Sequence, residues 1–163
     1  PEYRVLREPV EPLPQVLTPI YPITEGLTQG RLRQLVRQAF ATLSQRPLRV
    51  VVSRSRPPEN FVARMDEIAA RLAADGVTDH GVELHYVGSA GAKVGEILAG
   101  RVDAYVNEGG FWEWDAAAPL AVAVDHGMTA RHLDGRIIEF NKRPPWVDDI
   151  VIARPEAFAY VRG

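Results

Sequence analysis

The chain has 163 residues, of which 46% are hydrophobic and 25% charged, a composition typical of a globular domain with a sizeable core. Its formal net charge of -2 argues against a general polyanion binder, because such proteins carry a basic excess. Since cysteine is absent, disulfides and thiolate metal sites are excluded. No apolar run reaches the roughly 20 residues of a membrane span. We therefore expect a soluble, cytoplasmic protein.

The first 46 residues differ in character from the rest of the chain. Residues 1–21 should run extended, because closely spaced prolines forbid a helix there. Thr28 can then cap an amphipathic helix that ends before Pro47. We predict that residues 1–46 form an extended segment and a helix that packs against residues 47–163. Its apolar face would comprise Leu32, Leu35, Val36, Ala39, Phe40 and Leu43.

From Leu48 onward, strand patterns alternate with helix patterns. This alternation predicts a single α/β domain whose mostly parallel or mixed sheet is flanked by helices. A helix that carries Phe61 and Leu72 on its apolar face is expected to follow the first loop and to stop near Gly76; further helices are expected at Ser89–Leu98 and at Asp115–His126. Strands are expected at Leu48–Val52, Val82–Val87, Val102–Val106, Thr129–His132, Ile137–Phe140 and Ile150–Ala153.

Three times a predicted strand runs into a polar loop and then a helix. These loops are Ser53–Pro58, Gly88–Lys93 and Asn107–Asp115. Open α/β folds bind ligands beyond the carboxyl ends of their strands. If the three strands are parallel, the loops lie along one edge of the sheet and form one candidate site.

The second loop has the composition of an oxyanion site. Gly88 and its small neighbours let a ligand approach the backbone, and Ser89 can cap the following helix or donate its hydroxyl. Free N–H groups in the first helical turn favour negative charge, and Lys93 adds a cation one turn later. The alternative is a glycine-rich turn with a capping serine and a surface lysine.

The third loop contains a candidate metal ligand. Asp115 is expected at the start of a helix, where it would act either as an N-cap or as a carboxylate that holds Mg²⁺. Glu108 and Glu113 are close to it in sequence, although loop spacing does not guarantee that they converge. The four histidines lack metal-site spacing and are interpreted as structural.

Read together, the loops resemble one known family. The series comprises VVSRSRPP (Val51–Pro58), VGSAGAK (Val87–Lys93), GRVDAYVNEGGFWEWDAAAP (Gly100–Pro119) and RHLDG (Arg131–Gly135). It resembles the C-terminal half of 3'(2'),5'-bisphosphate nucleotidases of the CysQ type, within the inositol monophosphatase superfamily. The resemblance runs from about residue 47 to the end of the chain.

The resemblance implies a Mg²⁺-dependent phosphomonoesterase that removes the 3'-phosphate from adenosine 3',5'-bisphosphate or its sulfated relative. Asp115 would then be a metal ligand. Ser89 and Lys93, with Gly88, would contact the substrate phosphate or nucleotide, as would Ser53 and Arg54 in the first loop.

The chain also departs from this family. An upstream glutamate and an Asp-Pro-x-Asp-Gly-Thr motif hold further metals in the family, and neither occurs before Leu48. With Asp115 alone, a metal-bound water has nothing to hold or deprotonate it. We therefore expect a catalytically incomplete domain. The alternatives are an active enzyme completed by a partner chain, a binding module that keeps the oxyanion loop without turnover, and a folded structural module without activity. A homodimer could cover the interface left by the missing half.

The first part of the chain resembles a different family. PEYRVL (Pro1–Leu6) and LTPIYPITEGLTQGRLRQLVRQAF (Leu17–Phe40) resemble the end of the wedge domain of RecG-type DNA helicases. The segment lacks the DNA-facing barrel and a Walker A motif, so we do not expect it to bind nucleic acid. Two resemblances that meet near Ser44–Pro47 point to a recombined chain, natural or engineered.

Overall fold

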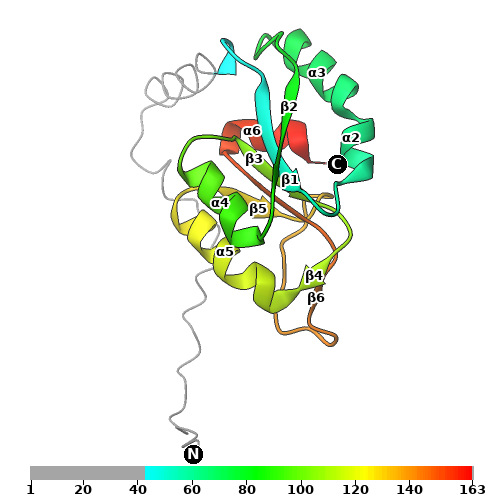
Figure 1. Cartoon of the computed structure of the whole chain (residues 1–163), viewed down its shortest axis with the longest axis vertical. Coiled ribbons are helices and arrows are strands. Elements are labelled where there is room, and N and C mark those ends of the chain that lie inside the picture. The colour runs from blue at the N-terminus through cyan, green and yellow to red at the C-terminus, as the bar shows by residue number, and fades with distance from the viewer. Residues whose placement is uncertain (1–42, 163) are drawn as a thin grey trace, which may run out of the picture.

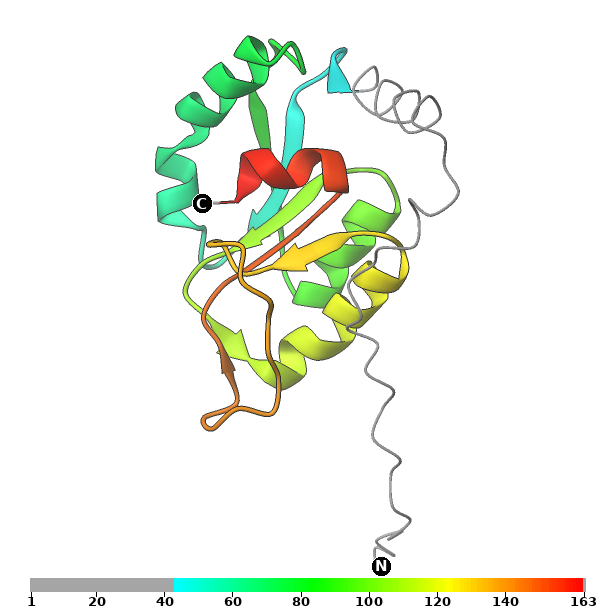
Figure 2. The same ribbon diagram turned by 180° about the vertical axis from the view of Figure 1, so that it is seen from behind.

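The computed structural model describes residues 43–162, which form a mixed sheet covered by helices on both faces (Figures 1 and 2). The predicted extended segment and most of the predicted amphipathic helix lie outside these residues. The elements are β1 (Leu48–Ser53), α2 (Glu59–Ala63), α3 (Met65–Ala74), β2 (Val82–Val87), α4 (Ala90–Leu98), β3 (Ala104–Asn107), β4 (Phe111–Trp112), α5 (Glu113–Asp125), β5 (Thr129–Arg131), β6 (Trp146–Val147), β7 (Ile150–Ala153) and α6 (Pro155–Val161).

The main sheet has five strands in the order β2-β1-β3-β7-β5. β1 pairs in parallel with both β2 and β3, whereas β7 pairs antiparallel with β3 and with β5. A separate pair, β4 and β6, lies beside the start of α5 (Figure 1). The prediction of an α/β domain with a mostly parallel or mixed sheet is confirmed, and the sheet is mixed.

Two hydrophobic cores lie on opposite faces of the sheet. Successive side chains of a strand point to opposite faces, so Val50 and Val52 enter one core and Val51 enters the other. The first core is covered by α2, α3 and α6, and Figure 2 shows α6 in front of the sheet. The second core is covered by α4 and α5, which pack against each other. Both cores hold the β-branched strands that the sequence pattern indicated.

Several predicted boundaries are wrong. Residues Ile137–Phe140 form no strand; Ile138 and Phe140 are apolar because they pack against the second core, not because they pair. The helix predicted after the first loop is two helices, which meet at Arg64. The last large helix begins at Glu113, two residues before the predicted start at Asp115. Side-chain burial therefore explains apolar spacing that we had assigned to regular structure.

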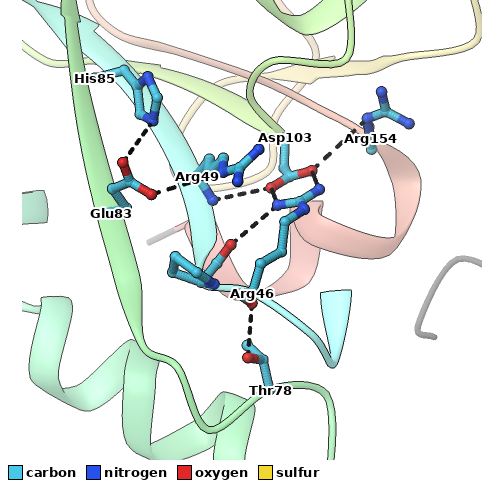
Figure 3. A network of polar contacts seen from close by, with 8 residues as sticks. Arg46, Arg49, Thr78, Glu83, His85, Asp103 and Arg154 are labelled. Carbon is cyan, nitrogen blue, oxygen red and sulfur yellow. Dashed lines mark hydrogen bonds and ion pairs between the residues drawn. The ribbon is translucent and has the colours of Figure 1, made fainter. Parts of the chain in front are cut away.

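At the amino ends of β1 and β3, Asp103 gathers partners from three segments of the chain (Figure 3). Its carboxylate is 2% exposed and accepts two hydrogen bonds from the Arg46 guanidinium, at 2.6 and 2.7 Å. The backbone N–H of Arg49 donates to it at 3.0 Å, and the Nε of Arg154 lies 4.0 Å away. The bonds to Asp103 raise the pKa of Arg46. One buried carboxylate thus joins β1, β3 and β7.

This network also anchors the end of the predicted first unit. Arg46 accepts a hydrogen bond at its carbonyl from the Thr78 hydroxyl at 2.8 Å (Figure 3). Leu43 is buried in the first core. Residues 43–46 therefore pack against the remainder of the described chain, while the arrangement of residues 1–46 as a unit stays a prediction.

We expect Asp103→Ala to lower the free energy of unfolding by about 3 kcal/mol, because it leaves the Arg46 guanidinium without its buried partner. Urea unfolding followed by circular dichroism measures this loss. Glu96→Ala is the matched control, since it removes an ion pair with the solvent-exposed Arg101 and should leave the midpoint nearly unchanged. Equal losses of unfolding free energy in the two variants would show that the buried Asp103 stabilises the fold no more than an exposed ion pair does.

Candidate functional site

The three polar loops lie along one edge of the sheet, as predicted. β2, β1 and β3 are adjacent and parallel, with Leu48 opposite Val82 and Val50 opposite Ala104. Their carboxyl ends therefore point the same way, and the segments that follow Ser53, Val87 and Asn107 emerge together. This is the end of the sheet opposite Asp103.

The second loop bends sharply into α4. Ser89 is the N-cap, and its hydroxyl accepts a hydrogen bond from the N–H of Ala92 at 3.4 Å. Its φ of 31° is in a region that residues with a side chain rarely adopt, at a cost of about 1–3 kcal/mol. Strain of this size persists only where the surrounding structure enforces it. Gly88 and Ser89 are both exposed, so the first turn of α4 is open to a ligand.

Lys93 is buried beneath this turn, with 4% of its surface exposed. Its ammonium donates to the carbonyl oxygen of Ser89 at 3.3 Å and lies 5.0 Å from the centre of the Tyr105 ring. Burial lowers the pKa of Lys93, and the charge of Arg56 lowers it further. The alternative interpretation of Lys93 as a surface lysine is therefore wrong. A buried cation without a carboxylate partner among the described residues is typical of an anion site.

The first loop brings guanidinium groups to the same place. The Nη2 atom of Arg54 lies 3.8 Å from where a Cβ on Gly88 would be, and its backbone N–H donates to Val87 at 3.3 Å. Ser53 is buried, and its hydroxyl accepts a hydrogen bond from the N–H of Arg56 at 3.2 Å. Arg54 thus lies beside Gly88 in the second loop, whereas the Ser53 hydroxyl is engaged within its own loop.

Two residues at this edge escaped the sequence analysis. Arg56 is close enough to Lys93 to lower its pKa, although it is three residues beyond the strand. Asn107 ends β3 and is buried, and its Nδ2 has no hydrogen-bond partner among residues 43–162. A polar residue at the end of an apolar strand was the available signal for Asn107. The sequence holds no comparable signal for Arg56, because its closeness to Lys93 depends on how the loop folds.

Asp115 is exposed in the first turn of α5. The N-cap of that helix is Trp112, so the interpretation of Asp115 as an N-cap is wrong. Its carboxylate makes no hydrogen bond or ion pair with any other residue that the structure describes, and both oxygens remain available. Carboxylate oxygens suit Mg²⁺, which binds through one or two carboxylates and substrate phosphates. Asp115 fits one position of such a site.

The neighbouring glutamates are already engaged. Glu108 accepts hydrogen bonds from the backbone N–H groups of Asn60 and Phe61, at 3.0 and 2.9 Å, where α2 begins. Glu113 is buried and accepts from two backbone N–H groups near residue 141, at 2.7 and 3.0 Å. Within the described part of the chain, no group of three His, Asp or Glu side chains is arranged to hold a metal. Both glutamates therefore hold backbone segments in place through hydrogen bonds to N–H groups.

We expect Lys93→Met to raise the free energy of unfolding at neutral pH by about 1 kcal/mol, because it removes a desolvated charge and keeps the buried stem. A lowered pKa means that the folded chain binds this proton more weakly than the unfolded chain, so native stability rises with pH up to the ordinary lysine value of 10.5. The advantage of Lys93→Met should therefore shrink at alkaline pH.

Urea unfolding at neutral and alkaline pH measures this difference. Lys142→Met, which replaces the chain's other lysine at a partly exposed position, is the matched control. A loss of stability in Lys93→Met of the same size at both pH values would contradict the prediction and assign Lys93 a structural role.

Among the described residues, no helix is both long and apolar enough to cross a membrane. The model of the inositol monophosphatase family matches residues 27–159. This match begins inside the segment that resembles a helicase wedge domain. The comparisons with known proteins give no support to that resemblance or to a recombined chain.

The chain is also similar to individual known proteins. The 3'-phosphoadenosine 5'-phosphate phosphatases of Mycobacterium tuberculosis and Mycobacterium leprae are each 39% identical over 116 residues, 71% of this chain. CysQ from Bacteroides thetaiotaomicron, a solved structure, is 26% identical with a TM-score of 0.48, covering 66% of this chain and 37% of that one. The matched region spans only 39% and 38% of the two mycobacterial proteins. The chain belongs to the inositol monophosphatase family.

Proposed function

We propose that this chain is a phosphatase-derived unit of the 3'(2'),5'-bisphosphate nucleotidase type that binds a phosphorylated nucleotide at the start of α4. The observation that carries the proposal is the burial of Lys93 under the strained turn at Ser89, without a carboxylate partner in the described chain. The names of the mycobacterial relatives, 3'-phosphoadenosine 5'-phosphate phosphatases, support the substrate class. Adenosine 3',5'-bisphosphate is the substrate proposed.

In this proposal the phosphate lies against the first turn of α4. The free N–H groups of that turn and the helix dipole favour negative charge, and Gly88 lets the ligand approach. Lys93 supplies a positive charge from below, with hydrogen-bond donors beyond the one given to Ser89. Arg54 closes the site from the first loop. Ser53 supports that loop through its bond with Arg56.

Mg²⁺ is the cofactor proposed, with Asp115 as one of its ligands. When bound, Mg²⁺ would stabilise the charge of the transferring phosphoryl group and activate a water molecule. The contribution of Asp115 is a carboxylate that no described neighbour neutralises, in the first turn of α5, the helix that packs against α4.

We further propose that residues 1–163 by themselves bind the nucleotide but hydrolyse it poorly. The support is that Glu108 and Glu113 are engaged with backbone N–H groups, which leaves Asp115 as the free carboxylate of the third loop. Two-metal hydrolysis of phosphate needs several anionic ligands. A partner chain that supplies them would make an active enzyme, which is the second candidate function.

We expect calorimetric titration to detect binding of adenosine 3',5'-bisphosphate, and Lys93→Met to weaken it at least tenfold. A hydrogen bond to a charged group contributes about 1.5–3 kcal/mol, which accounts for this factor. Lys142→Met should bind like the unsubstituted chain. If the unsubstituted chain binds neither this nucleotide nor inorganic phosphate, the proposed function is wrong.

We expect Mg²⁺ to tighten nucleotide binding, and Asp115→Asn to remove that effect, because the substitution neutralises the free carboxylate. Asp125→Asn, at the opposite end of α5, is the matched control and should retain it. Release of inorganic phosphate, measured in parallel, should be near background for every variant. Sustained Mg²⁺-dependent release by the unsubstituted chain would contradict the proposal of incomplete catalysis and favour the active enzyme.

A further inference from the structure

The three tryptophans of the chain form one cluster where β4 and β6 meet the start of α5. The rings of Trp112 and Trp114 are stacked, with centroids 4.9 Å apart and planes 9° from parallel. Trp146 meets Trp112 edge-on, with centroids 5.1 Å apart and planes at 88°. We call Trp112 and Trp114 the indole stack. Its rings come from the end of β4 and the first turn of α5.

The indole stack is supported from behind. β4 and β6 pair so that Trp112 is opposite Trp146, which fixes the edge-on contact. The ring of Trp146 lies over Gly110, where a Cβ would come within 2.5 Å of the indole. Gly110 has a φ of 69°, a conformation that favours glycine. Backbone and ring thus hold Trp112 in place, and Trp112 in turn orients Trp114.

The outer ring of the stack is open to solvent. Trp112 is 43% exposed and Trp114 is 63% exposed, the highest value for a large hydrophobic residue in the described chain. Since Trp112 covers one face of the Trp114 ring, the exposed surface includes the opposite face. Burying an exposed aromatic face against another planar ring is favourable. A rigid indole with one free face is therefore suited to receive an aromatic ligand.

We propose that the free face of Trp114 stacks on the nucleobase of the bound nucleotide. The inference rests on the proposed function and specifies which part of the ligand lies where. Trp114 directly precedes Asp115, and α5 packs against α4, whose first turn is the proposed phosphate site. Phosphate and base would thus be held by neighbouring helix starts at one edge of the sheet.

Stacking predicts a particular specificity. Base–aromatic stacking contributes about 1–3 kcal/mol per base and tolerates different bases, because every base has a π-face. Trp114 would then distinguish nucleotides from sugar phosphates and prefer the larger purine rings. A protein segment that covers the indole stack is the competing explanation.

The test compares two ligands and three variants by calorimetric titration, with adenosine 3',5'-bisphosphate as the nucleotide and ribose 5-phosphate as the ligand without a base. Trp114→Ala should weaken nucleotide binding by about 5- to 150-fold, the factor that corresponds to the stacking energy above. Binding of ribose 5-phosphate should not change. Trp114→Phe, which keeps a stacking ring, should retain most of the affinity for the nucleotide.

A third variant guards against a folding effect. Trp114→Leu keeps apolar bulk without a ring, and it should weaken nucleotide binding as much as Trp114→Ala does, with an unchanged circular dichroism spectrum. An unchanged nucleotide affinity in Trp114→Ala, or an equal loss for both ligands, would overturn the inference and leave the proposed function intact. Failure of the unsubstituted chain to bind either ligand would overturn both.

A self-association experiment separates the competing explanation. Light scattering across a range of protein concentrations measures the solution mass of the unsubstituted chain and of Trp114→Ala. The same monomeric mass for both, together with weakened nucleotide binding, is the expected result. Association that is lost in Trp114→Ala while nucleotide affinity stays unchanged would assign the indole stack to protein contact and refute base stacking.

Discussion

Parallel pairing of β1 with both β2 and β3 is the constraint on which the rest of the molecule depends. Parallel strands require crossover connections; here α2 and α3 connect β1 to β2, and α4 connects β2 to β3. Because all three strands run the same way, each is followed by a loop at the same edge. The turn at Gly88–Ser89, the loop that carries Arg54 and Arg56, and the segment that leads from β3 toward α5 therefore emerge at one edge although they are far apart in sequence. Antiparallel pairing of any one strand would send its loop to the opposite end.

The buried charges at the two ends of the sheet differ in their partners. At the amino end, Asp103 is satisfied by the Arg46 guanidinium and the Arg49 N–H, so the charge holds strands together. At the carboxyl end, the partners of Lys93 within residues 43–162 are a carbonyl and an aromatic ring, with no carboxylate among them. A paired buried charge is consistent with a structural role, whereas an unpaired one is costly and typical of function. Because of this contrast, we propose that the anion site lies at the carboxyl end of the parallel strands, beside Lys93.

The acidic residues of the third loop divide in a similar way. Glu108 and Glu113 are close to Asp115 in sequence, yet both are engaged with backbone N–H groups that begin α2 or shape the loop near residue 141. Asp115 has no such bond among the described residues, so its charge is available to a cation. Trp114 shares this position at the start of α5 and adds an open aromatic face. Metal and base recognition would thus originate from one helical turn.

The sequence alone determined the alternation of strands and helices, because apolar spacing and glycine-rich turns are local properties of the chain. It also predicted that Ser89 caps the start of a helix, which the structure confirms, since capping depends on residues a few positions apart. Only the tertiary structure decided that Lys93 is buried. Burial depends on Tyr105 and on what packs around it, which local pattern does not contain.

Tertiary contacts also determined two features that the sequence pattern did not predict correctly or did not predict at all. Ile137–Phe140 has the apolar residues of a strand, but in the structure it forms no strand. A strand needs a neighbouring strand to pair with, and the residue pattern of one segment does not show whether such a neighbour lies beside it. The stack of Trp112 on Trp114 needs Trp146 behind it, which is brought across by the pairing of β4 with β6. Residue types and spacing specify what a loop is able to bind. The fold specifies which groups are free to do so, because burial and hydrogen bonding are properties of the whole packed chain.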